Sequence, residues 1–341
     1  MQYSLGLFPT ELSDLGRRAS IAETAGFGSV WVGDIQSTHP ELYTSLTAIA
    51  LSTKAATFGP GVTNPVTRDP AVTASAIATL SAATNGRAFM GIGGGDSALH
   101  NVGLRPAHLE ALEAYITAVT SLWRTGSATY RGRSLLLKWW EDRHPIPVYV
   151  AAHGPRTQEL AGRVADGVII GTGFTPNAIA VAQAAIGRGR ESAEQPREQF
   201  TSWYFSMVNI ADDDETAAQQ LATPLAALAN LLIRNGPEGK VIPDHLIPAF
   251  QELERRYDFS THAESTGEGP NARVIRELGL LDYMIERFAI AGTPDTVVRR
   301  LTALKEVGVE NLWFTRTVGD VELFLERWKD EVRPSLDRLG M

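Results

Sequence analysis

The most informative stretch of this 341-residue chain is Thr57-Phe58-Gly59-Pro60-Gly61-Val62-Thr63-Asn64-Pro65-Val66-Thr67-Arg68-Asp69-Pro70. Its apolar, β-branched start predicts a strand, and Gly-Pro-Gly predicts that the strand ends there. Pro65 prevents a helix from forming at once, whereas Pro70 suits the first turn of one. An ordinary loop carries the same turn residues, but a contorted backbone at the end of a strand is also typical of a ligand site.

Outside this stretch, segments with strand and helix character alternate, which is the pattern of a parallel sheet covered by helices. Eight such strands predict an α/β fold, a (β/α)8 TIM barrel with insertions, as one domain over residues 1–341. An open doubly wound sheet is the alternative, and it would place a glycine-rich turn where Phe8-Pro9-Thr10-Glu11 stands. The predicted strands are residues 2–8, 29–33, 57–61, 87–92, 147–151, 167–170, 202–210 and 310–315, and the predicted helices are 11–25, 41–53, 70–83, 106–123 and 156–164.

Residues 235–282 break this alternation with turn-forming runs such as Gly236-Pro237-Glu238-Gly239. A segment of this length without barrel periodicity usually covers a site or an interface. We therefore expect a lid-like insertion within the domain. A surface excursion with no role is the alternative.

The composition excludes several classes of protein. The chain has 44% hydrophobic and 21% charged residues, as an ordinary globular enzyme does. It contains no cysteine, so disulfides, thiolate metal sites and cysteine nucleophiles are excluded, and we expect no metal. A net charge of −8 argues against nucleic-acid and anionic-membrane partners, which require clustered Lys and Arg. No leader or membrane span is apparent, so we expect a cytoplasmic protein.

The barrel also predicts where the chemistry lies, because catalytic groups in this architecture follow the carboxyl ends of the strands. The residues that follow predicted strands are 34–39, 61–64, 93–96, 152–155 and 171–174.

Two of these segments have informative chemistry. Gly91-Ile92-Gly93-Gly94-Gly95-Asp96 lacks the spacing of a dinucleotide or P-loop fingerprint, but consecutive glycines let the backbone approach a flat ligand closely. Asp96 either orients a substrate or caps the next helix. Gly154 and Pro155 begin a predicted helix whose free N–H groups suit an anion such as a cofactor phosphate. His153 is either a cofactor contact or an ordinary loop histidine.

Three motifs resemble the bacterial luciferase-like superfamily, and within it the branch of coenzyme F-420 (deazaflavin) dependent reductases related to methylenetetrahydromethanopterin reductase. They are Gly-Pro-Gly-Val-Thr-Asn-Pro-x-Thr-Arg at 59–68, Ala-Ala-x-Gly-Pro at 151–155 with Glu-Leu-Ala-Gly from 159, and Gly292-Thr293-Pro294. The resemblance implies a non-prolyl cis peptide at Gly61-Val62, which forms a bulge behind the deazaflavin ring. The cofactor-binding residues that it implies are Gly61, Val62, Thr63, Asn64, Gly93, Gly94, Gly95, Ala151, Ala152, His153, Gly154 and Thr172.

The chain also departs from this family. Many members carry Asp-His where it has Asp34-Ile35, so proton transfer by the family histidine is in doubt, and His39 of the same loop is a substitute. The archaeal pterin reductases carry a carboxylate where this chain has Gly6, so we assign no pterin substrate. The candidate catalytic residues are Asp34, His39 and Asp96.

The function that these features predict is hydride transfer between coenzyme F-420 and an unidentified small organic substrate. An FMN-dependent monooxygenase of the same superfamily is the close alternative. Arg156 near Gly154 is compatible with it, because an arginine at this place can bind a flavin phosphate. A non-catalytic flavin-binding barrel is the third possibility, because Ile35 and Gly6 replace the histidine and the carboxylate that family members carry. Small apolar helix faces at 41–53 and 70–83, which family members commonly use to dimerise, lead us to expect a homodimer.

Overall fold

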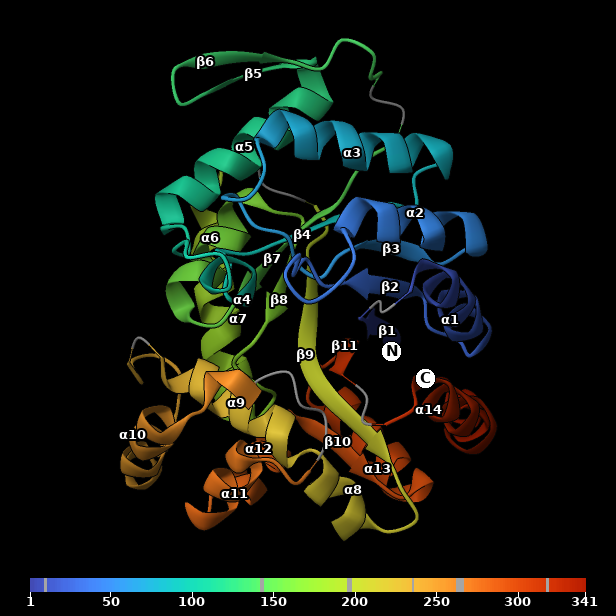
Figure 1. The fold of residues 1–341 in the computed structure, drawn as a ribbon, viewed down its shortest axis with the longest axis vertical. Helices are drawn as coiled ribbons and strands as arrows, with labels where there is room; N and C mark the ends of the chain where they lie inside the picture. The colour runs from blue at the N-terminus through green and yellow to red at the C-terminus, as the bar shows by residue number, and fades with distance from the viewer. Residues whose placement is uncertain (9–10, 142–143, 195–197, 235, 262–266, 317–318) are drawn as a thin grey trace.

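Eight parallel strands form a barrel at the centre of the molecule (Figure 1). The computed structural model describes residues 1–341 except 9–10, 142–143, 195–197, 235, 262–266 and 317–318. All eight predicted strands are present, so the barrel prediction is confirmed. In spatial order they are β1 (Gln2–Leu7), β2 (Ser29–Val32), β3 (Thr57–Pro60), β4 (Met90–Ile92), β7 (Val148–Ala152), β8 (Gly167–Ile170), β9 (Thr201–Ile210) and β11 (Asn311–Arg316).

The barrel closes between β3 and β4 through bridges that lie partly outside the regular strands. Phe58 bridges Ala88, and Thr63 bridges Ile92. The Thr63 N–H donates to the Gly91 carbonyl, and the Gly93 N–H donates to the Thr63 carbonyl, both at 3.0 Å. The residues that follow the Gly-Pro-Gly break therefore complete the barrel.

Helices surround the barrel, and local sequence explains where they begin. The Asp69 carboxylate accepts the Ala71 N–H at 3.0 Å, and Pro70 occupies the first turn of its helix. Thr293 caps a later helix in the same way. The surrounding helices are α1 (Leu12–Thr24), α2 (Leu42–Ser52), α3 (Pro70–Ala83), α5 (Leu109–Thr125), α6 (Pro155–Val164), α7 (Pro176–Glu191), α13 (Pro294–Glu306), α14 (Val321–Arg327) and α15 (Arg333–Arg338).

Large aromatic side chains fill the middle of the barrel. The rings of Trp31 and Trp313 stack at 4.9 Å with an interplanar angle of 26°. Side chains alternate between the two faces of a strand, so residues two positions further along point into the barrel again. Many of these inward positions are small, but Phe205 stands two residues beyond Trp203, and its ring lies 5.5 Å from that of Trp313. The aromatic layer is Trp31, Phe89, Tyr149, Trp203 and Trp313, and the small residues beyond it are Gly33, Gly61, Gly93, Ala151 and Gly171.

The predicted insertion is mainly helical and has an apolar core of its own, which it shares with the preceding helix α9 (Ala222–Ile233). Figure 1 shows these helices gathered at one end of the molecule. Residues 235 and 262–266 of the predicted range lie outside the described residues. The elements between β9 and β10 are α8 (Asp214–Gln220), α9, η1 (Asp244–Leu246), α10 (Ile247–Arg256), η2 (Phe259–Thr261), α11 (Pro270–Glu277) and α12 (Leu281–Phe288).

Among the described strands, a hairpin and one short strand were not predicted. A hairpin of β5 (Ser127–Tyr130) and β6 (Arg133–Leu136) projects at the end opposite the insertion (Figure 1). Its turn residues Arg131 and Gly132 have φ values of 49° and 75°, as a tight hairpin turn requires, but arginine is not a residue that signals such a turn. The short strand β10 (Ala289–Gly292) extends the sheet by pairing with β9.

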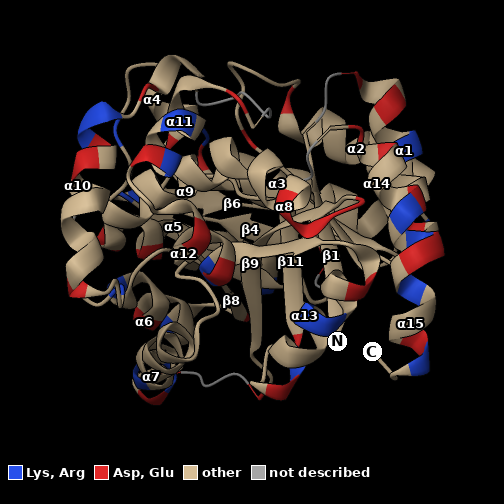
Figure 2. Cartoon of the chain, turned by 90° about the horizontal axis from the view of Figure 1, so that it is seen from below, with Lys and Arg blue, Asp and Glu red and all other residues tan. Residues whose placement is uncertain are grey.

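Charged residues lie mainly on the outer helices, and both signs are interspersed in the view of Figure 2. The central strands are largely uncharged in this view. Among the described helices, none is both long and apolar enough to span a bilayer.

The closure of the barrel predicts a severe effect for Gly91→Ala. A Cβ atom at Gly91 would lie 2.1 Å from the Pro60 carbonyl oxygen, so the two strands would have to separate. We expect a loss of about 1–3 kcal/mol in the free energy of unfolding, measured by chemical denaturation. Gly28→Ala is the control, because its Cβ would meet nothing within 4 Å. Equal stability of the two variants would contradict this account of the closure.

Candidate active site

The peptide bond between Gly61 and Val62 is cis, at the position that the family resemblance implies. The Val62 side chain lies against the backbone of β4, 3.2 Å and 3.3 Å from where Cβ atoms of Gly91 and Gly93 would stand. A Cβ at Gly61 would lie 2.7 Å from Cβ of Trp31 and 2.9 Å from Cζ2 of Trp313. The bulge therefore rests on the aromatic layer and leaves room for no side chain at Gly61.

The residues around the bulge suit a planar ligand. Glycine and alanine make up much of the surrounding rim, where the backbone can approach a flat ligand closely. The ring of Phe205 also lies there, 6.1 Å from that of His153 and 5.5 Å from that of Trp313. Two buried polar atoms beside the bulge, Asp34 Oδ1 and Asn64 Nδ2, have no partner among the described residues. Buried polar groups in native proteins nearly always have hydrogen-bond partners, so a polar ligand at this place would supply the partners that these two atoms lack. The residues present thus fit a deazaflavin or flavin ring.

Asp34 is buried at the end of β2, and its other oxygen is fully engaged. Oδ2 accepts a 2.7 Å hydrogen bond from the Thr63 hydroxyl and a 2.5 Å bond from Nη1 of Arg68. Asn64 is also engaged through its oxygen, which accepts the N–H groups of Val66 and Thr67. The structure brings three of the predicted residues, Asp34, Thr63 and Asn64, into one buried cluster.

His39 lies in the loop between β2 and α2. Its ring centroid is 5.4 Å from that of Phe8, which follows β1. Phe8 in turn lies 3.1 Å from where a Cβ atom of Gly33 would stand. His39 is thereby placed at the carboxyl end of the barrel, above strands β1 and β2.

Asp96 pairs with a cation from the insertion side of the molecule. Its Oδ1 accepts a 2.6 Å hydrogen bond from Nη1 of Arg234, which follows α9, and lies 3.4 Å from Nε2 of His100. Among the described contacts its carboxylate makes no capping bond to α4 (Ser97–His100). Of the two predicted roles, capping is therefore wrong, because the carboxylate is turned to Arg234.

His153 follows β7 and is held by the next strand. Its Nδ1 lies 3.2 Å from the Gly171 carbonyl, which can only accept, so Nδ1 carries the proton and Nε2 is left as an acceptor. Burial lowers the pKa of His153, so its imidazole is neutral near pH 7. A Cβ at Gly171 would lie 2.2 Å from Nδ1, and therefore glycine is required there.

The segment at the start of α6 lies beneath the insertion. Gly154 precedes the helix and Pro155 opens it, as predicted, which leaves N–H groups of its first turn outside the helical hydrogen bonds. A Cβ at Gly239 would lie 2.7 Å from Cγ of Pro155, so the insertion passes directly over this end. Lys240 follows, buried, with its ammonium 2.6 Å from the Arg234 carbonyl. Burial lowers the pKa of Lys240.

Thr172 belongs to a different set of contacts from the bulge. Its hydroxyl accepts from Gln158 at 3.2 Å, and its carbonyl accepts from Nε of Arg287 at 2.8 Å. Arg287 is fully buried and also donates to the carbonyls of Lys240 and Val241. It thus ties the loop after β8 to the insertion.

Sequence reasoning missed Arg234, Lys240 and Arg287, which bring three cations to the insertion side of the barrel mouth. The available signal was Lys240 directly after the turn Gly236-Pro237-Glu238-Gly239. Nothing local to Arg234 or Arg287 distinguishes them from surface arginines on amphipathic helices.

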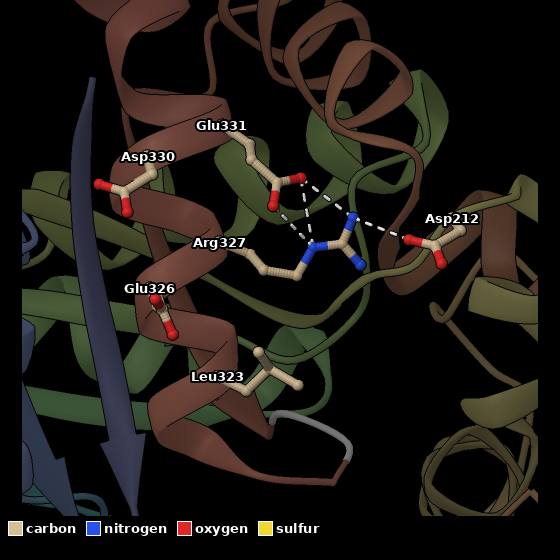
Figure 3. Close-up of a pocket in the computed structure, with 6 residues that line it drawn as sticks. All are labelled: Asp212, Leu323, Glu326, Arg327, Asp330 and Glu331. Carbon is tan, nitrogen blue, oxygen red and sulfur yellow. Dashed lines mark hydrogen bonds and ion pairs between the residues drawn. The ribbon is translucent and has the colours of Figure 1, made fainter.

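A separate recess, with a volume of about 450 Å³, lies between α14 and the end of β9 (Figure 3). Arg327 pairs there with Asp212 at 3.2 Å and with Glu331 at 3.0 Å. None of the predicted site residues lines it. Among the described residues, no group of three His, Asp or Glu side chains is arranged to hold a metal ion.

Comparison with known proteins adds three findings. Residues 3–311 match the family model described as luciferase-like monooxygenase. The chain is 28% identical over 327 residues to 5,10-methylenetetrahydromethanopterin reductase of Archaeoglobus fulgidus, covering 93% of each chain. It is 28% identical over 353 residues to the F-420-dependent glucose-6-phosphate dehydrogenase of Amycolatopsis mediterranei, covering 96% of this chain and 95% of the relative.

A solved structure resembles the whole fold. It is the coenzyme F-420-dependent tetrahydromethanopterin reductase from Methanopyrus kandleri, with a TM-score of 0.76 and 25% identity. The match covers 98% of this chain and 99% of that one.

The neutral state of His153 predicts a dependence of stability on pH. Because its pKa is lower in the folded chain, the unfolded chain takes up this proton first as the pH falls below about 6.5, and stability is lost. His153→Gln should therefore lose less unfolding free energy than the wild type between pH 7.5 and 5.5, measured by urea denaturation. The exposed His108→Gln is the control. A loss in His153→Gln as large as in the wild type would contradict this assignment.

Proposed function

Because the chain belongs to the luciferase-like monooxygenase family, we propose that it uses the barrel mouth to transfer a hydride between coenzyme F-420 and a small organic substrate. When bound, the deazaflavin supplies the carbon centre that gives or accepts the hydride. The protein supplies binding, orientation and exclusion of water. The single observation that carries this proposal is the pair of buried polar atoms without partners beside the bulge, Asp34 Oδ1 and Asn64 Nδ2, above the aromatic layer.

The relatives support the choice of cofactor. An F-420-dependent dehydrogenase and methylenetetrahydromethanopterin reductases match nearly the whole length of the chain, and the solved reductase that matches 98% of it is F-420 dependent. Their substrates differ from one another, so they do not determine the substrate of this chain. The absence of a carboxylate at Gly6 still separates it from the pterin reductases as a group.

We assign the cofactor to the predicted residues as follows. The backbone of 61–64 and 93–95 supports one face and one edge of the ring, and 151–154 with Thr172 holds the opposite edge and the anionic tail. His153 offers Nε2 as an acceptor, since its Nδ1 donates to Gly171. His39 is the side chain in the substrate-facing loop that can carry a proton. Asp96 orients the substrate through Oδ2, since Oδ1 accepts from Arg234.

The insertion is proposed as a lid. Gly239 packs on the start of α6, and Arg287 holds the Lys240-Val241 backbone against Thr172. Val241 has a φ of 54°, a conformation that β-branched residues rarely adopt. Arg287 donates to the carbonyl of Val241 and to that of the preceding residue, Lys240. These contacts keep the insertion over the proposed site within a single domain.

An FMN-dependent monooxygenase is the second candidate, because more distant solved structures of the same fold include FMN enzymes. Arg156 is exposed in the first turn of α6, where it is available to a flavin phosphate. A non-catalytic barrel is less favoured, because the relatives that match nearly the whole chain are a reductase and an F-420-dependent dehydrogenase.

Direct binding distinguishes these candidates. We expect the apoprotein to bind coenzyme F-420 with a Kd in the micromolar range or below, measured by fluorescence, and to bind FMN more weakly. FMN that stays bound through purification, together with no F-420 binding at micromolar concentrations, would reject the proposal. Oxygen-dependent turnover of reduced FMN would favour the monooxygenase.

We also propose that the chain is a cytoplasmic homodimer that associates through α2 and α3. Leu51 and Val72 are exposed on these helices, at 84% and 55%, and small alanines surround them. We expect light scattering to give twice the 36.9 kDa mass of the chain, and Val72→Glu to shift it toward one mass. A monomeric wild-type mass would contradict this assembly.

A further inference from the structure

Arg68 joins the two ends of the loop that carries His39. This loop runs from Asp34, at the end of β2, to Glu41, at the start of α2. Nη1 of Arg68 donates to Asp34 Oδ2 at 2.5 Å, and Nη2 donates to Glu41 Oε1 at 2.9 Å. One guanidinium therefore bridges the first and last residues of the loop.

The bridge is shielded from solvent on its inner side. The side chains of Arg68 and Asp34 are 15% and 1% exposed, and that of Glu41 is 48% exposed. The guanidinium also lies over the ring of Tyr43, 5.1 Å from its centroid. Charged pairs that water reaches poorly hold their geometry better than exposed pairs do, and removing one partner leaves a buried charge behind.

The loop between the two acids also has contacts of its own. Asn101 Nδ2 donates to the Ser37 hydroxyl at 2.8 Å, and the His39 ring centroid lies 5.4 Å from that of Phe8. The N–H groups of Thr38 and His39 both donate to the Ile35 carbonyl at 3.0 Å. Gln36 Nε2 donates to the Ala98 carbonyl of α4 at 2.8 Å. These contacts order the middle of the loop, and the Arg68 bridge fixes its two ends.

The same carboxylate oxygen also reaches the bulge. Asp34 Oδ2 accepts the hydroxyl of Thr63, which follows the cis peptide and whose backbone bonds to Gly91 and Gly93 close the barrel. Arg68 and Thr63 thus share one oxygen, and Asp34 connects the substrate-facing loop to the ring-binding backbone. Oδ2 of Asp34 is held by these two donors and fixes the position of both, whereas Oδ1 has no partner among the described residues.

We propose that Arg68 is a positioning residue, which acts through Asp34 and Glu41 to hold the His39 loop and the Thr63 junction in register at the barrel mouth. Asp34 then serves the reaction by orienting its neighbours, and proton transfer falls to His39. This inference rests on the proposed function for its purpose, but the bridge itself does not depend on which cofactor binds.

Hydrogen exchange and cofactor binding test the inference together. Arg68→Met should speed amide exchange in residues 35–42 at least about tenfold, while exchange in α13 changes little, because only the loop loses its anchor. The Kd for coenzyme F-420, measured by fluorescence, should rise at least about tenfold. Arg133→Met is the matched control, since Arg133 makes a 2.5 Å pair with Asp69, the residue next to Arg68, but is 57% exposed. It should leave both values unchanged.

Two further variants separate positioning from simple loss of stability. Asp34→Asn/Arg68→Met removes both charges of the buried pair, so it should recover much of the global stability lost in Arg68→Met without recovering loop protection or affinity. Arg68→Lys keeps the charge, but a single ammonium does not reproduce the planar fork, so its loop should also exchange faster.

A folded double variant with wild-type loop exchange and wild-type affinity would overturn the inference. If the wild type itself binds no F-420, the proposed function fails, and the exchange experiment still decides whether Arg68 anchors the loop.

Discussion

The candidate site depends on one pair of backbone hydrogen bonds, through which Thr63 completes the closure between β3 and β4 that begins at Phe58. The Thr63 N–H binds the Gly91 carbonyl, and its carbonyl accepts the Gly93 N–H. β3 and β4 approach so closely here that a Cβ atom at Gly91 has no place. These bonds close the barrel and at the same time fix the bulge and the glycine turn. The same backbone hydrogen bonds therefore complete the barrel and hold the candidate site in shape.

The interior of the barrel follows from that constraint. Aromatic side chains fill the middle layer, where Trp31 and Trp313 stack, and they supply a rigid apolar surface beneath the bulge. Above them several strands carry glycine or alanine, whereas β9 carries Phe205, which packs on Trp313. The buried acid Asp34 and its partner Arg68 then connect this layer to the loop that faces the substrate.

Much of this could be predicted from sequence because the signals are local. The strand at 57–61 shows its break in its own residues, and Pro70 and Pro155 mark helix starts. The hairpin at 127–136 was not predicted, since its turn places Arg131 at positive φ, where sequence rules expect glycine or asparagine. The cations of the insertion were missed for a different reason. Arg234 meets Asp96 across 138 residues, and Arg287 meets Thr172 across 115. Pairs so distant in sequence are created by the fold, and a single sequence carries no pattern that announces them.

The central claim is that the bulge and the glycine rim together hold a planar tricyclic coenzyme over the aromatic layer. A crystal structure of the complex with coenzyme F-420 tests it most directly. The account predicts the ring in van der Waals contact with Val62 and the backbone of Gly93, with its edge above Trp31 and Trp313. A ring bound elsewhere, with side chains of the chain itself filling the space above the bulge, would contradict it.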